Sequence, residues 1–358
     1  MRTAALKLKY SKAQTFHVAV VSTVSSGKST FINALIGNEL LPAENQVCTS
    51  RTVAVLDNDR ATDITGHILY SRGEYEKIPS CTAAQISGLL NSKEPDIADV
   101  IIECSIPGVR STQKSLMIVD TPGINNSMDV THAEITTQYI KSMSSGLIVF
   151  IINATQMGTN DECALLGSVK QLLDKTPELN IIFVLNKVDE LDMEKEPLEK
   201  VMQNCYSYLK GLGFGNVALY PVSAQAAMLF KKALANAPMT KKEMIDFTRF
   251  FEQFASPGLQ LSLYAIPGTE SSLDETCVVG PQRMSRRELL SSLANTGLAA
   301  VERAVEDAML RQFDVKPLRV TGPVKKTSQG NKSPAQRIST RAFPMPKRPT
   351  MRKKKGQT

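Results

Sequence analysis

Short apolar runs alternate with amphipathic stretches along the first two thirds of the chain. Continuous apolar runs of strand length lie at 16–21, 116–119, 147–152, 181–185 and 217–222. Apolar residues three and four positions apart predict helices near 29–36, 130–143, 160–174 and 194–211. Strands that are apolar throughout are typical of a parallel sheet covered on both faces. The pattern therefore predicts an α/β fold, with a mostly parallel sheet and helices on both of its faces.

Two segments depart from this simple alternation. Residues 53–110 are predicted to form a hairpin and a short helix, inserted after the first helix. Residues 225–313 are predicted to be mostly helical, with a loop and one short strand at 258–280. The chain is thus predicted to comprise a lead-in at 1–15, an α/β domain at 16–225, a helical segment at 226–314 and a tail at 315–358.

Composition excludes several classes of protein. Of the 358 residues 42% are hydrophobic, which is enough for a large core and excludes a wholly disordered chain. The longest apolar run, 146–152, is far shorter than the ~20 residues of a membrane-spanning helix. The N-terminus lacks the pattern of a secretory signal, and six scattered cysteines without a C-x-x-C pair fit reduced thiols. These features predict a cytoplasmic protein, with peripheral association at a membrane or nucleoid left open.

Positive charge is concentrated in the tail. Residues 315–358 contain 13 Lys and Arg, six Pro and no acidic residue. Because the whole chain carries +7, the first 314 residues carry −6. The tail is predicted to be disordered. Its partner stays open among the phosphates of a nucleic acid, an anionic membrane surface and no partner at all.

The first apolar strand runs into a loop with the character of a phosphate-binding site. Gly27 lets the chain turn, so that backbone N–H groups at the start of the next helix surround a phosphate. Lys28 supplies positive charge to the β- and γ-phosphates, and the Ser29 hydroxyl is a ligand for Mg²⁺. The predicted phosphate-binding residues here are Ser26, Gly27, Lys28, Ser29 and Thr30. Ser22 replaces the first glycine of this kind of loop, which predicts strain if that position needs a positive φ.

Asp120 and Gly123 follow the second of these strands, in the sequence Asp-Thr-Pro-Gly. A carboxylate at this strand end can hold Mg²⁺, and the Gly123 N–H can sense the γ-phosphate. A surface turn is the alternative interpretation of the same four residues.

Asn186, Lys187 and Asp189 follow the strand at 181–185. The Asp189 carboxylate can accept two hydrogen bonds from guanine, at N1–H and at the 2-amino group, whereas adenine lacks both donors. The Lys187 stem can lie on the base, and Asn186 can brace the loop. Backbone N–H groups of Ser223 and Ala224, after the strand at 217–222, can reach the guanine carbonyl. A charged surface turn is the alternative, but the three stronger motifs would coincide by chance only about 2 × 10⁻⁵ times per chain.

Together these residues resemble the GTPase domain of the dynamin superfamily, especially of bacterial dynamin-like proteins. The loop and helix V-S-S-G-K-S-T-F-I-N-A-L-I-G resemble the family's segment, and the resemblance covers 16–225. Leu41-Pro42 followed by Cys48-Thr49 is similar to the family's switch segment, which singles out Thr49. Asp120 follows Lys28 by 92 positions, a longer spacing than in small Ras-like GTPases, and dynamin-like domains carry an insertion in this part of the chain. The nearest subgroup by resemblance is the bacterial dynamin-like protein that binds the replication sliding clamp.

The resemblance implies a Mg²⁺-dependent GTPase that binds GTP and GDP, with Ser25, Lys28 and Thr49 as catalytic residues. It assigns the metal to Ser29, Thr49 and Asp120. Val24 stands where eukaryotic dynamins have a glutamine that orients the attacking water. Slow intrinsic turnover follows, with faster turnover expected in a homodimer across the nucleotide face. The helical segment is too short for the full stalk of membrane-remodelling members.

Two other functions stay open beside a GTPase. One is a GTP-gated binding module without significant turnover. The other is an RNA- or ribosome-associated GTPase whose basic tail contacts RNA. Gln260–Tyr264 resembles a sliding-clamp-binding pentapeptide, with a short strand as the favoured alternative. The histidines at 17, 67 and 132 have no triad or metal spacing, and His17 is expected in the core.

Overall fold

The computed structural model describes residues 15–42, 52–91, 96–110, 115–121, 130–143, 145–255, 259–266, 278–279 and 284–314. Nine strands form the main sheet: β1 Thr15–Ser22, β2 Thr52–Asp57, β3 Thr65–Tyr70, β4 Tyr75–Ile78, β5 Ile97–Cys104, β6 Ser115–Asp120, β7 Gly146–Asn153, β8 Leu179–Asn186 and β9 Leu219–Val222. The helices are α2 Lys28–Ile36, α3 Ala83–Asn91, α4 Val130–Ser142, α5 Asn160–Leu173, α6 Leu198–Gly211, α7 Ala224–Leu234, α8 Lys241–Phe254, α9 Arg286–Asn295 and α10 Leu298–Asp314.

The strand order of the main sheet is β4-β3-β5-β2-β6-β1-β7-β8-β9. The five strands β6-β1-β7-β8-β9 are parallel and correspond to the five predicted apolar runs. This half of the sheet confirms the predicted α/β fold. It also brings the C-terminal ends of β1, β6, β7, β8 and β9 to one edge, where ligands bind in open α/β sheets.

The insertion completes the other half of the sheet. The predicted hairpin is β3–β4 and the predicted short helix is α3, so both are confirmed. Strands β2 and β5 were not predicted: they pair with each other in parallel, and β2 joins the core by running antiparallel to β6. The insertion therefore extends the main sheet as well as carrying the hairpin.

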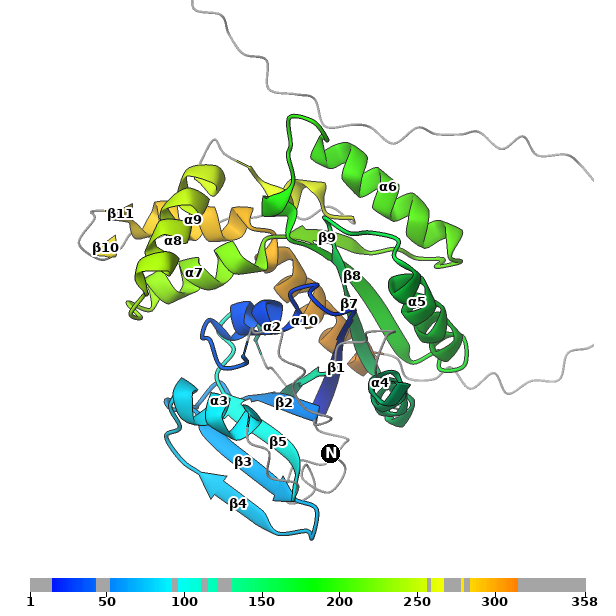
Figure 1. The fold of residues 1–358 in the computed structure, drawn as a ribbon, viewed down its shortest axis with the longest axis vertical. Coiled ribbons are helices and arrows are strands. Elements are labelled where there is room, and N and C mark those ends of the chain that lie inside the picture. The colour runs from blue at the N-terminus through cyan, green and yellow to red at the C-terminus, as the bar shows by residue number, and fades with distance from the viewer. Residues whose placement is uncertain are drawn as a thin grey trace, which may run out of the picture. The chain divides into compact units, whose positions relative to one another are not determined.

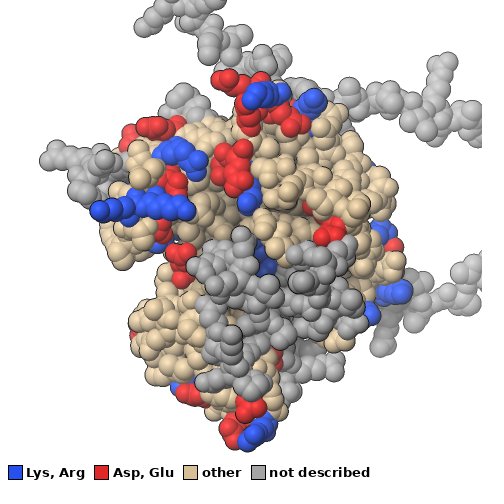
Figure 2. Space-filling view, in the orientation of Figure 1, with Lys and Arg blue, Asp and Glu red and all other residues tan. Residues whose placement is uncertain are grey.

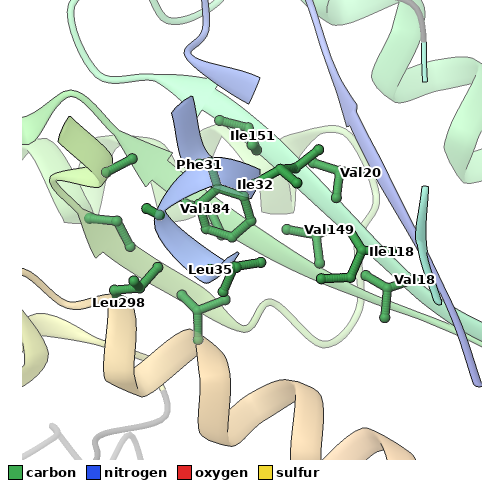
Figure 3. Close-up of a cluster of buried hydrophobic side chains, with 14 of the residues drawn as sticks. Val18, Val20, Phe31, Ile32, Leu35, Ile118, Val149, Ile151, Val184 and Leu298 are labelled. Atoms are coloured by element: carbon green, nitrogen blue, oxygen red, sulfur yellow. The ribbon is translucent and has the colours of Figure 1, made fainter. Parts of the chain in front are cut away.

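Helices cover both faces of the sheet (Figure 1), with α4, α5 and α6 on one side and α2, α7 and α10 on the other. Figure 3 shows Val18, Val149 and Val184 from three neighbouring strands beneath Leu35 of α2 and Leu298 of α10. Because side chains alternate along a strand, Met117 and Val119 of β6 point to the opposite face, where Tyr139 of α4 packs against their cluster. His17, expected in the core, is half-buried and lies 3.1 Å from the Tyr139 hydroxyl.

The C-terminal helices share this core. Phe230 of α7 makes edge-on contacts with Phe247, Phe251 and Phe254 of α8, at ring-centroid distances of 5.6, 6.5 and 6.4 Å. Lys231 of α7 is buried, with its Nζ 2.6 Å from the Glu302 carboxylate of α10. The same Nζ donates to the Leu35 carbonyl of α2, at 3.0 Å. One buried ammonium thus joins three helices from distant parts of the sequence.

The segment that resembles a clamp-binding pentapeptide forms a 3₁₀ helix, η3 Leu261–Tyr264, so the expected short strand is absent there. Leu261 is fully buried whereas the Leu263 side chain is 62% exposed. A short strand within 258–280 does occur, as β10 Val278–Val279 paired with β11 Met284–Ser285. None of the helices in the described part of the chain is long and apolar enough to cross a membrane.

Candidate nucleotide site

The predicted phosphate-binding loop lies at the C-terminal end of β1. Ser22 is the last residue of that strand, and the left-handed backbone falls instead on Ser25, with φ 63°, and on Gly27, with φ 82°. The strain predicted for Ser22 is therefore absent, because the turn is made three residues later. Gly27 caps α2, so the backbone N–H groups of the first helical turn point into the loop.

The loop is held by short contacts within it. The Thr23 and Ser26 hydroxyls are 2.9 Å apart, and Ser26 is buried. Val24 and Ser25 face solvent, with the Val24 side chain 43% exposed. Val24 is therefore on the open side of the loop, where it can exclude water but cannot hydrogen-bond it.

Lys28 and Asp120 form an ion pair on this edge of the sheet. The pairing follows from the sheet, since β1 and β6 are parallel neighbours and Val20 is in register with Asp120. The Thr121 hydroxyl donates to the Val20 carbonyl at 2.7 Å and holds the start of the following loop against β1. The two motifs that were separated by 92 residues are thus brought together.

The donor chemistry here fits Mg²⁺ bound together with a phosphate. No group of three or more His, Cys, Asp or Glu in the described residues could hold a metal ion by itself. Ser29, in the first turn of α2, and Asp120 supply hard oxygen atoms, which Mg²⁺ prefers and which it usually combines with substrate phosphates. Thr49 and Gly123, the other residues predicted to contact Mg²⁺ or the γ-phosphate, lie outside the described residues.

Asn186 connects the predicted phosphate loop to the segments predicted to bind the base. Its side-chain amide donates to the Ser26 carbonyl at 2.9 Å, and its Oδ1 accepts from the Ala224 N–H at 3.1 Å. Its backbone carbonyl accepts from the Ala154 N–H at 2.9 Å. The side chain is 2% exposed, so these bonds are shielded from water. Asn186 fixes the spacing between the phosphate loop and the segment that follows β9.

Asp189 lies where β8 turns into the short helix η2 Val188–Glu190. Lys187 takes the left-handed conformation there, with φ 64°, and its Nζ lies 3.4 Å from the Glu190 carboxylate. Burial raises the pKa of Asp189, while a hydrogen bond with Ser223, a backbone hydrogen bond and the positive charge of Arg249 oppose that rise. Ser223 also caps α7, since its hydroxyl accepts from the Ala226 N–H at 3.3 Å. The two predicted base-reading segments therefore touch.

One cavity of about 740 Å³ joins the two halves of the site. Gly27 of the phosphate loop and Asp189 both line it, together with Asn186 and Lys187. This size suits a nucleotide base and sugar. The motifs expected to bind one nucleotide thus face one space.

The far wall of the cavity is helix α8, which sequence reasoning did not assign to the site. Residues of α8 that line the cavity are Lys242, Glu243, Asp246, Arg249 and Phe250. The apolar spacing in the sequence predicted this helix. That spacing does not indicate that the helix lies beside the loop of Asp189, 60 residues earlier in the chain. Figure 2 shows acidic and basic side chains interspersed on this face of the molecule, without a large patch of one sign among the described residues.

The Asn of the N-A-L motif has a structural role. Asn33 is fully buried, and its Oδ1 accepts from the N–H groups of Leu40 and Leu41, at 3.0 and 2.9 Å. Its Nδ2 donates to the Leu41 carbonyl at 2.7 Å. Asn33 therefore fixes the chain directly before Pro42 and the predicted switch segment.

The sequence of this part of the chain is similar to that of known proteins. Residues 18–188 match the sequence model of the dynamin family. The chain is 28% identical over 306 residues to a probable transmembrane GTPase, FZO-like and chloroplastic, of Arabidopsis thaliana, covering 84% of this chain and 29% of that protein. It is 27% identical over 188 residues to the bacterial dynamin-like protein of Nostoc punctiforme, covering 49% and 25%. It is 29% identical over 204 residues to mitofusin-2 of Rattus norvegicus, covering 54% and 25%. The chain spans less than a third of the length of each of these relatives.

Proposed function

Because residues 18–188 are a dynamin-family domain, we propose that this chain binds GTP with Mg²⁺ and hydrolyses it. The observation that carries the proposal is the shared cavity. A glycine of the phosphate loop and the Asp189 carboxylate line the same space, and Asn186 ties their loops together. A single nucleotide can therefore contact both. The proposed GTPase domain spans 16–225, and residues of α7, α8, α9 and α10 share its hydrophobic core.

Guanine is the base that the Asp189 side fits. A half-buried carboxylate held by Ser223 can accept from N1–H and the 2-amino group, and adenine would leave it unpaired. Lys187, in its left-handed turn, can lay its stem along the base.

Hydrolysis depends on positioning and charge. The Lys28 ammonium and the first-turn N–H groups of α2 would hold the β- and γ-phosphates. Ser29 and Asp120 would hold Mg²⁺, which would supply positive charge to those phosphates. Ser25 would support the γ-phosphate, and the sequence assigns Thr49 and Gly123, which lie outside the described residues, to the same phosphate. The exposed Val24 cannot orient the attacking water, so intrinsic turnover is slow and rises on self-association across the nucleotide face.

The test is nucleotide binding by wild type and Asp189→Asn. Wild type is expected to bind GTP at least about tenfold more tightly than ATP, because hydrogen bonds to a charged group contribute about 1.5–3 kcal/mol each. Asp189→Asn should lose GTP and gain xanthosine triphosphate, in which an oxygen replaces the 2-amino donor. Equal binding of GTP and ATP by wild type would refute the proposed base contact.

A GTP-gated binding module is the second candidate function, and the exposed Val24 favours it. Single-turnover hydrolysis of bound GTP distinguishes the two, with Lys28→Ala as the inactive control. A rate in wild type no faster than that of Lys28→Ala would favour the binding module.

Further partners belong to the same proposal. The tail at 315–358 has 13 Lys and Arg and no acidic residue, so it would carry binding to RNA or to an anionic membrane, and the protein would act in the cytoplasm or at its periphery. Removal of 315–358 should abolish the salt-sensitive binding to either surface. Binding of a sliding clamp by 260–264 would require Leu261 to leave the core, so Leu261→Ala and Leu263→Ala should both reduce clamp pull-down.

A further inference from the structure

Helix α8 is fixed firmly enough to present side chains to a bound nucleotide. Thr240 and Glu243 form a capping box, in which the Thr240 hydroxyl accepts from the Glu243 N–H at 3.2 Å and the Thr240 N–H donates to the Glu243 carboxylate at 2.7 Å. Glu243 also forms an ion pair with Lys232 of α7. Phe250 and Phe254 are buried beneath the helix. Helix α7 begins directly after Ser223, which hydrogen-bonds Asp189. Because α8 is fixed to α7, its position relative to the Asp189 carboxylate is fixed as well.

A guanine bound at Asp189 still has acceptors to satisfy, among them O6 and N7. Asp189 takes the donors of the Watson–Crick edge, N1–H and the 2-amino group, but O6 and N7 each need a donor. The Ala224 N–H, expected from the sequence to reach O6, donates instead to Asn186 Oδ1 at 3.1 Å. The Ser223 N–H likewise donates to the Thr296 carbonyl at 3.0 Å, so both backbone N–H groups expected to reach the guanine carbonyl already have acceptors.

Arg249 is the side chain of α8 best suited to supply a donor. Arg249 lines the same cavity as Asp189, and its positive charge opposes the rise in the pKa of that carboxyl. The guanidinium carbon lies 4.5 Å from the centre of the Phe250 ring, and one nitrogen lies 3.8 Å from the Asp246 carboxylate. The side chain is 64% exposed, so its head can turn towards a base without disturbing the core. Lys242, the other α8 cation on this wall, lies two helical turns away and offers a point charge without a planar fork.

We propose that Arg249 is a specificity-determining residue that donates to O6 and N7 of the guanine held by Asp189. A guanidinium matches this pair of acceptors in bidentate geometry. Adenine presents an amino group in place of O6, so Arg249 and Asp189 reject it at two adjacent edges. The inference rests on the proposed guanine nucleotide site, and it adds a residue from outside the segments that the base-binding motifs cover.

The experiment measures equilibrium affinities for GTP and for 7-deaza-GTP, in which a C–H replaces N7. Arg249→Ala should bind GTP about tenfold or more weakly than wild type, as expected for a lost bidentate contact. Its loss for 7-deaza-GTP should be smaller, because that analogue has already given up one of the two bonds. Arg249→Lys should restore only part of the GTP affinity. Lys241→Ala removes a charge from the same helix outside the cavity and should leave both affinities unchanged.

Equal losses for GTP and 7-deaza-GTP in Arg249→Ala, or full rescue by Arg249→Lys, would overturn the contact and leave a purely electrostatic effect on Asp189. Unchanged GTP affinity in Arg249→Ala would also overturn it. If these results occur while wild type binds GTP and Asp189→Asn switches to xanthosine triphosphate, only this inference fails. If wild type binds no GTP, the proposed function itself fails.

Discussion

Asn186 is the residue whose exchange tests the architecture of the site most directly. It uses both ends of its amide, as a donor to the Ser26 carbonyl and as an acceptor from the Ala224 N–H. Asn186→Asp keeps the size and the acceptor but removes the donor. It also places a carboxylate oxygen about where the amide nitrogen lies, 2.9 Å from the Ser26 carbonyl oxygen.

The expected cost of Asn186→Asp is about 2–4 kcal/mol in the free energy of unfolding. A lost hydrogen bond accounts for about 1 kcal/mol, and a buried carbonyl left without a donor costs about 1–3 kcal/mol more. A buried unpaired carboxylate raises its own pKa. When protonated it can donate to Ser26 again, so the defect is absent below the unfolded pKa of an aspartate and grows as the pH rises through the folded one.

The assay is thermal unfolding and GTP titration at pH 5 and pH 8. Asn186→Asp should melt at least about 4 °C below wild type at pH 8. It should bind GTP at least tenfold more weakly there, because the phosphate and base loops are no longer tied. Both differences should shrink at pH 5.

Asn153 provides the matched control. It is in register with Asn186 on β7 and is also buried, but its described hydrogen bonds use only Oδ1, which accepts from the N–H and the hydroxyl of Thr155 at 3.0 and 2.8 Å. Asn153→Asp keeps that acceptor and should cost less than about 1 kcal/mol. Equal losses in the two variants, or a pH-independent loss in Asn186→Asp, would refute the reasoning.

Three further predictions test other parts of the molecule. Lys231→Met should lower the free energy of unfolding, measured in urea, by about 3–5 kcal/mol, because it leaves the Glu302 carboxylate buried and unpaired. Lys231→Met/Glu302→Leu should recover most of that loss, and a double variant as unstable as the single one would contradict this. Gly27→Ala forces a residue with a side chain to adopt a backbone φ of 82°, so it should reduce both stability and GTP affinity. Gly167→Ala lies in open space on helix α5, so it should leave GTP affinity unchanged and not destabilise the protein. Burial raises the pKa of Glu162 from 4.5. Ionisation of this carboxyl therefore destabilises the fold as the pH rises through the raised pKa. Glu162→Gln should gain stability over wild type between pH 4.5 and pH 7, as measured by denaturant titration.

The parallel half of the sheet was readable from the sequence because each strand carries its own apolar run. Strands β2 and β5 were missed because their apolar residues lie within a longer insertion, and because the antiparallel pairing of β2 with β6 is set by contacts far apart in the chain. The segment 260–264 misled for a local reason. Its alternation suggested a strand, in which Leu261 and Leu263 would share a face, but one is buried and the other 62% exposed, as in a helical turn.

The positions of the motif residues at the strand ends could be predicted for a similar reason, since each motif lies in its own turn. Gly27 and Lys187 take left-handed conformations at the ends of β1 and β8, and the parallel sheet then brings those ends together. The contribution of Ala224 was not readable, because only the fold shows that its N–H meets Asn186.

The position of helix α8 beside the site could not be predicted from the motifs. Its Phe residues gave its helical character, but its place beside Asp189 comes from the contact of Phe230 with Phe247 and from the ion pair of Lys232 with Glu243. Residue 225 lies inside α7, and α7 begins directly after the predicted base-binding segment. The packing that fixes α8 therefore begins in that helix. In the proposed site, recognition of the base therefore depends on the short motifs and also on the way the helical segment packs on the sheet. A protein that shared all the motifs but docked this helix differently would keep its phosphate site and change its discrimination between purines.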